Sequence, residues 1–86
     1  MPTISVFYGI AIRMYFDEHA PPHFHAYYGA EAAMIDIGTG AVREGSLPRR
    51  ALRLVREWTA LHRDGLLANW EFAREHRPLQ SIDPLD

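Results

Sequence analysis

The sequence predicts an α+β domain, with an antiparallel β-meander of three to four strands covered on one face by a C-terminal αα-hairpin. Apolar and polar residues alternate in the first half of the chain, which is typical of strands with one buried face. From Arg49 onward the apolar residues recur with helical spacing. The connections between the predicted strands are short, so neighbouring strands should pair antiparallel. The helices are the only cover that the sequence offers for the apolar face of the sheet.

The strand pattern is clearest between Ile10 and Asp17, where apolar side chains occupy every second position. Gly9 indicates a bend or bulge before this run. The pair Pro21-Pro22 cannot donate hydrogen bonds to a sheet, so pairing should resume at His23. Glycines after the third and fourth runs predict hairpin turns. The predicted strands are residues 3–8, 10–17, 23–28, 31–37 and a short edge segment, 41–44.

Two helices are predicted after Pro48, which suits the first turn of a helix. The first begins at Arg49, and Asp64-Gly65 should end it. The second runs from about residue 66 to 76 and ends before Pro78, because the residue preceding a proline avoids the helical region. The predicted inward-facing residues are Ala51, Leu52, Leu54, Val55, Trp58, Leu61 and His62 in the first helix, and Leu66, Trp70 and Ala73 in the second.

Length and composition indicate one small domain over residues 1–86, with residues 78–86 as an extended C-terminal tail. The chain has no cysteine, which excludes disulfides and thiolate metal sites. Its formal charge of −2 gives no overall bias toward nucleic acid. No apolar run is long enough to span a bilayer and no signal-peptide pattern is present, so we expect a soluble, cytoplasmic protein without a membrane partner.

The segment from Asp17 to His25 holds the main candidate site. In a strand that starts at His23, the side chains of His23 and His25 share one face. Two adjacent imidazoles suit a divalent metal such as Zn²⁺, with His19 or Asp17 as the nearest further ligands. Three protein ligands and an open position would make a site of the catalytic type.

A metal-free acid–base site is the alternative use of the same histidines. His23 and His25 beside Arg13 and Tyr15 resemble the equipment of a ribonuclease, in which one imidazole accepts a proton and the other donates one. Arg13 would then stabilise the charge on phosphorus. A third interpretation is structural: the two histidines belong to a half-buried strand and bond to neighbouring groups.

Two surfaces are candidates for binding another chain. One is an arginine stripe on the outer face of the first helix, which could meet an acidic partner or simply be solvated. The other is the tail, whose apolar residues recur every third position and could dock on a partner or pack on the domain itself. RNA and a second copy of the chain are further candidate partners. The candidate contact residues are Arg49, Arg53, Arg56 and Arg63 in the stripe, and Leu79, Ile82 and Leu85 in the tail.

Several segments together resemble a bacterial family of short proteins, domain-of-unknown-function family 4160. The most specific is Pro21-Pro22-His23-Phe24-His25, and the others are residues 1–5, 7–10, 14–16, 47–52 and the tail from Pro78 to Leu85. The resemblance implies no established activity. It implies a genetic context, because such genes commonly sit beside another small gene in an arrangement like a toxin–antitoxin pair.

Two functions therefore remain open from the sequence. The first is a component of a two-gene, toxin–antitoxin-like module that works through a small protein encoded by the neighbouring gene. The second is a small enzyme, either a metal-dependent hydrolase or a metal-free ribonuclease, that uses His23 and His25.

Overall fold

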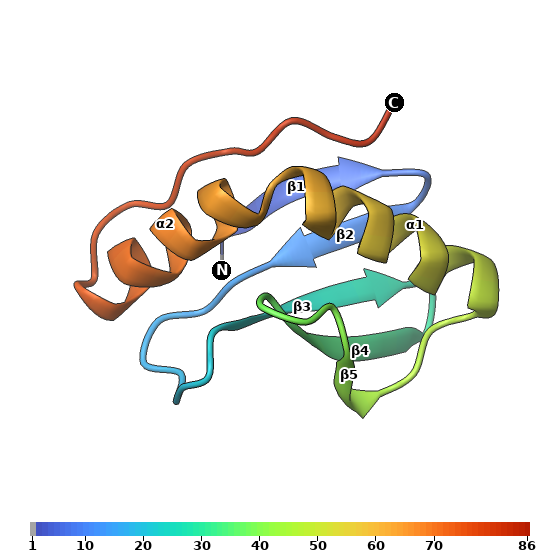
Figure 1. The fold of residues 1–86 in the computed structure, drawn as a ribbon, viewed down its shortest axis with the longest axis horizontal. Helices are drawn as coiled ribbons and strands as arrows, with labels where there is room; N and C mark the ends of the chain where they lie inside the picture. The colour runs from blue at the N-terminus through green and yellow to red at the C-terminus, as the bar shows by residue number, and fades with distance from the viewer. Residues whose placement is uncertain (1) are drawn as a thin grey trace.

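The computed structural model describes residues 2–86 as a five-stranded antiparallel sheet followed by two helices (Figure 1). Every strand pairs with its sequence neighbour, in the order β1-β2-β3-β4-β5. The α+β class and the antiparallel meander are confirmed, with a slightly higher strand count than predicted. The elements are β1 (Thr3–Phe7), β2 (Ile10–Arg13), β3 (His23–Tyr28), β4 (Glu31–Asp36), β5 (Val42–Gly45), α1 (Arg49–Leu61) and α2 (Arg63–Arg74).

The first hairpin turns at Tyr8 and Gly9, which both have positive φ, 50° and 79°. Two such residues are typical of the type I′ turn, whose twist matches that of the flanking strands. Gly9 therefore lies in a tight turn between two paired strands rather than at a bulge. The next strand, β2, ends at Arg13, four residues earlier than the alternating pattern predicted. The chain then leaves the sheet over residues 14–22 and returns at His23.

The two faces of the sheet carry the residues that the alternation predicted. Phe24 and Ala26 of β3 are fully buried on the helix side, whereas His25 and Tyr27 of the same strand are only partly buried. The helix side of the sheet meets the inward faces of α1 and α2 in a single core. The largest fully buried apolar side chains in this core are Trp58, Phe24, Ile10, Ile12, Met14, Ile35, Ile37, Leu66 and Val55.

The helices follow one another across the sheet instead of folding back as a hairpin (Figure 1). The break lies at His62, which ends α1 and begins α2, and Gly65 lies inside α2. His62 keeps the chain close to helical, because its N–H donates to the carbonyl oxygens of Trp58 and Thr59. Leu61 is 67% exposed and does not belong to the inward stripe. Neither helix has the length and apolar character that a membrane crossing requires, within the residues described.

The tail packs on its own domain. Leu79, Ile82 and Leu85 lie partly buried against the core. The Ile82 N–H donates to the carbonyl oxygen of Ile4 at 2.8 Å, which fastens the tail beside β1. In Figure 1 the tail runs past α2 and along the β1 side of the molecule. The tail therefore does not offer these three side chains as free anchors for a partner, which was the other alternative left open by the sequence.

Candidate metal centre

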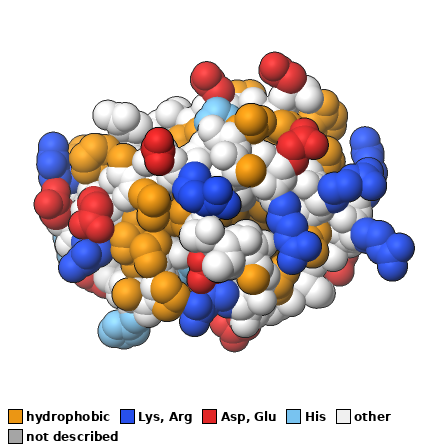
Figure 2. Space-filling view, in the orientation of Figure 1, with side chains coloured by type: hydrophobic (Ala, Val, Ile, Leu, Met, Phe, Trp, Pro, Cys, Tyr) orange, Lys and Arg blue, Asp and Glu red, His pale blue; other side chains and the backbone are white. Residues whose placement is uncertain are grey.

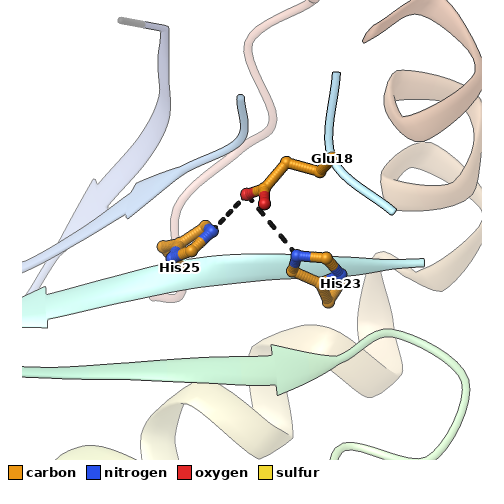
Figure 3. Close-up of side chains that lie close together, drawn as sticks. All are labelled: Glu18, His23 and His25. Carbon is orange, nitrogen blue, oxygen red and sulfur yellow. Dashed lines mark hydrogen bonds and ion pairs between the residues drawn. The ribbon is translucent and has the colours of Figure 1, made fainter. Parts of the chain in front are cut away.

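His23 and His25 lie on the same side of β3, with ring centroids 5.5 Å apart. The loop of residues 14–22 places the Glu18 carboxylate over both rings (Figure 3). Glu18 Oε1 lies 2.5 Å from His25 Nε2 and 3.5 Å from His23 Nε2. One ligand atom from each residue lies within 4.8 Å of the other two. Glu18, His23 and His25 are called the 18/23/25 cluster below.

The His23 ring is held with one nitrogen aimed into this cluster. Its Nδ1 lies 2.8 Å from the carbonyl oxygen of Pro21. A carbonyl oxygen only accepts, so Nδ1 carries the proton and, in the neutral ring, Nε2 presents a lone pair. Nε2 is buried and has no hydrogen-bond partner among the described residues. Metal-ligating histidines commonly show this pattern, in which the second nitrogen donates to a backbone carbonyl and fixes the ring.

Burial differs between the two histidines. His23 is 5% exposed, and its ring centroid lies 5.1 Å from that of Trp70 in α2. His25 is partly exposed on the uncovered face, where it pairs across the strands with Arg13 and makes a T-shaped contact with the Tyr15 ring, with ring centroids 4.8 Å apart. His25 therefore lies away from the helices, whereas Trp70 of α2 contacts His23.

The two further metal ligands suggested by the sequence lie elsewhere. Asp17 Oδ1 is 2.6 Å from Nε2 of His76, which links the loop to the end of α2. His19 is exposed and borders a depression beside the cluster. The carboxylate that joins the histidines is Glu18, which the sequence reading did not select. The signal available was its position between Asp17 and the histidines, but only the loop conformation decides which carboxylate turns inward.

Arg13 and Tyr15 form a second group with Tyr27 on the uncovered face. The Arg13 guanidinium lies over the Tyr27 ring, 5.1 Å from its centroid. The hydroxyls of Tyr15 and Tyr27 are 2.6 Å apart. This hydrogen bond, together with burial, raises the pKa of Tyr27 to about 12. Both rings lie near His25, but neither Arg13 nor Tyr15 lines the depression beside the cluster.

Arg43 of β5 borders that depression. It is the extra residue of a β-bulge, because Val42 and Glu44 pair with the adjacent residues Ile35 and Met34. Its Nη1 lies 3.3 Å from Asp36 Oδ2. The sequence reading missed Arg43, since a bulge position leaves no mark on an alternating pattern. The depression is lined by Glu18, His19, Ala20, Pro21, His23, Met34 and Arg43.

The arginine stripe divides into two pairs. Arg56 and Arg63 donate from Nε to the carbonyl oxygens of Gly40 and Ile37, so they hold the helices to the β4–β5 turn. Arg49 and Arg53 are exposed, and neither makes an ion pair within residues 2–86. Figure 2 shows basic side chains over the part of the surface that α1 occupies.

The sequence model of the family described as "Domain of unknown function (DUF4160)" matches residues 9–71. The chain belongs to this family. The match runs from the first turn to α2 and includes all three residues of the 18/23/25 cluster. No curated protein and no solved structure matches the chain.

In this DUF4160 protein the three side chains offer two imidazole nitrogens and one carboxylate oxygen. This donor set is found around Zn²⁺ and Fe²⁺ in proteins, with further positions open to water or substrate. Ligands of a tetrahedral zinc ion lie about 3.4 Å apart, given bond lengths of about 2.0–2.2 Å. The separation of Glu18 Oε1 from His23 Nε2, 3.5 Å, fits this geometry, and the Glu18–His25 separation would have to lengthen by about 1 Å.

Proposed function

We propose that the 18/23/25 cluster binds a divalent transition metal ion such as Zn²⁺ and that the protein is a small metal-dependent hydrolase. The observation that supports this most directly is the buried Nε2 of His23, which has no hydrogen-bond partner among residues 2–86 and lies 3.5 Å from a carboxylate oxygen. A lone pair facing a carboxylate is unfavourable, and a cation between the two groups converts that repulsion into two attractive contacts.

The proposed reaction class follows from the number of ligands. Zn²⁺ bound by three protein side chains keeps a position for water and lowers the pKa of that water toward neutrality. The cluster lies beside an open depression, so a substrate can reach it from solvent. Trp70 and the fixed Nδ1 of His23 keep the His23 ring rigid, which favours a preorganised site.

Metal titration of the purified full chain tests the proposal. We expect about one equivalent of Zn²⁺ or Co²⁺ to bind, as measured by calorimetry and elemental analysis. Glu18→Gln keeps the size of the side chain but removes its charge, and His25→Ala removes one ligand, so both should lower the affinity at least tenfold. Asp17→Asn is the matched control, because Asp17 is a neighbouring carboxylate that contacts His76 instead. Equal metal affinity in the wild type and in Glu18→Gln would reject the site.

A metal-free ribonuclease is the second form of the enzyme proposal. The contact between Glu18 and His25 favours it, because a carboxylate that orients an imidazole is a common acid–base arrangement. The two forms differ in their response to chelation. RNA cleavage that persists in EDTA and disappears in His25→Ala would support the metal-free form, whereas cleavage that requires added metal would support the hydrolase.

We also propose that the protein works as a component of a two-gene, toxin–antitoxin-like module in the bacterial cytoplasm. The genetic context that the resemblance to the DUF4160 family implies supports this, together with Arg49 and Arg53, which are exposed and make no ion pair among residues 2–86 and so suit an acidic partner. Co-expression with the product of the neighbouring gene, followed by pull-down and a growth assay, tests it. Arg53→Glu should weaken capture at low salt, since exposed charges mainly affect association rate and salt dependence. Failure of the wild-type chain to capture that product would contradict the proposal.

A further inference from the structure

The depression beside the 18/23/25 cluster is small. It encloses about 250 Å³, below the roughly 300–1,000 Å³ of pockets that enclose whole drug-sized ligands. The wall is formed by the loop that carries Glu18, by His23, and by Met34 and Arg43 from the next two strands. A ligand bound at the metal would therefore insert one compact group here and leave the rest of its structure in solvent.

The charges around the depression favour an anionic group. Among the described residues that line the wall, Glu18 is the only acidic one, and it is a candidate metal ligand. Arg43 borders the depression. Among the described residues, its guanidinium donates one hydrogen bond, from Nη1 to Asp36 Oδ2 at 3.3 Å. The remaining guanidinium donors are free to bind a ligand. His19, exposed on the same wall, adds a further donor.

A divalent ion would leave this region with a net positive charge. One carboxylate ligand neutralises half of the charge of the ion, and Asp36 balances the charge of Arg43, so about one positive charge remains. A phosphate group is compact, carries one or two negative charges, and matches the planar fork of arginine. A neutral amide or ester would leave both the excess charge and the free arginine donors unsatisfied.

We infer, on the basis of the proposed metal site, that the protein acts on phosphate esters, with one phosphate oxygen at the open metal position and another on Arg43. The sequence suggested Arg13 as the residue that stabilises the charge on phosphorus. We assign this role to Arg43 instead, because Arg13 lies over Tyr27 and outside the wall of the depression. The phosphate could belong to a small monoester or to an RNA strand, which present the same group to the site.

The experiment uses the full chain loaded with Co²⁺, whose visible absorption reports changes at the metal. Millimolar inorganic phosphate should change this spectrum in the wild type. Arg43→Gln should weaken phosphate binding about tenfold or more, since a charge-assisted hydrogen bond is lost, and should leave Co²⁺ affinity within a factor of about three. Arg13→Gln is the matched control and should behave as wild type. A short RNA oligonucleotide that displaces phosphate identifies RNA as the source, and an oligonucleotide that does not displace it identifies a small phosphate ester.

The outcomes separate this inference from the proposal on which it rests. A protein that binds no Co²⁺ rejects the metal site itself. A protein that binds Co²⁺ normally but shows no spectral change with phosphate, or an Arg43→Gln variant with wild-type phosphate affinity, rejects the phosphate site while the metal site stands. Circular dichroism of each variant shows whether the fold is intact, and Arg43→Lys, which keeps the charge, should restore part of the affinity.

Discussion

Replacement of Trp58 by alanine should remove most of the stability of the domain. The Trp58 ring is fully buried and packs against Phe7 and Phe24, with ring centroids 5.2 and 5.8 Å away. Its Nε1–H donates to the carbonyl oxygen of Asp83 at 2.8 Å, so the variant also loosens the tail. Truncation of a buried tryptophan to alanine costs about 3–5 kcal/mol. The total stability of a domain of this size is on the order of 5–10 kcal/mol.

Thermal and urea unfolding followed by far-ultraviolet circular dichroism measure the effect. A loss of about 4 kcal/mol corresponds to a decrease of roughly 15–30 °C in Tm for a domain of this length. Trp58→Phe keeps most of the buried ring and should lose only about 1–2.5 kcal/mol, through a smaller cavity and the missing hydrogen bond. Leu61→Ala, at an exposed position one turn later, should stay within about 0.5 kcal/mol of wild type. A Trp58→Ala variant that melts within a few degrees of wild type would refute the packing described for α1.

Three further predictions follow from the site and the sheet. Zn²⁺ at about a hundredfold excess over its Kd should raise Tm by roughly 10–20 °C, and Glu18→Gln should abolish most of this shift; an equal shift in the variant would contradict the ligand set. Tyr27, with its pKa raised from 10.0 to about 12, should give a step near pH 12 in a titration at 295 nm, and Tyr15→Phe should lower that pKa. The folded form therefore loses stability as the pH rises from about 10 toward 12. Gly45→Ala should cost more than about 2 kcal/mol, because φ is +80° and the new Cβ would clash with the carbonyl oxygen of Ala32 in β4. Gly29→Ala, in an open turn, should cost about 1 kcal/mol.

The sequence predicted the features that depend on local periodicity. The alternation in β3 predicted that His25 shares one face of the sheet with His23 and that Phe24 lies on the opposite face, which is buried. The helical spacing identified Trp58 and Trp70 as buried residues. These predictions succeed because a pleated strand or a helix repeats its environment at fixed intervals, so the chain has to repeat its chemistry at the same intervals.

The parts that sequence reading missed depend on contacts between segments. The apparent strand from Ile10 to Asp17 stops at Arg13, where its pairing with β3 ends at His25 and the chain turns away into the proline-containing loop. Glu18 reaches the histidines through a loop conformation that no periodic pattern encodes. Arg43 enters the wall of the depression through a bulge. The helix break at His62 instead of Gly65 shows that a glycine inside a helix is tolerated where packing supports it.

The position of the tail also limits how copies of this chain can associate through their sheets. A sheet with two free edges can add a strand at either side and grow into an open fibre. Here the C-terminal residues lie beside β1, and the Ile82 N–H donates a hydrogen bond to the Ile4 carbonyl oxygen. The opposite edge of the sheet is β5. The carbonyl group of Ile4 is therefore already occupied on the β1 edge, whereas most residues of β5 are exposed at the opposite edge. The tail thus protects part of one sheet edge from pairing with a foreign strand, in addition to covering the core.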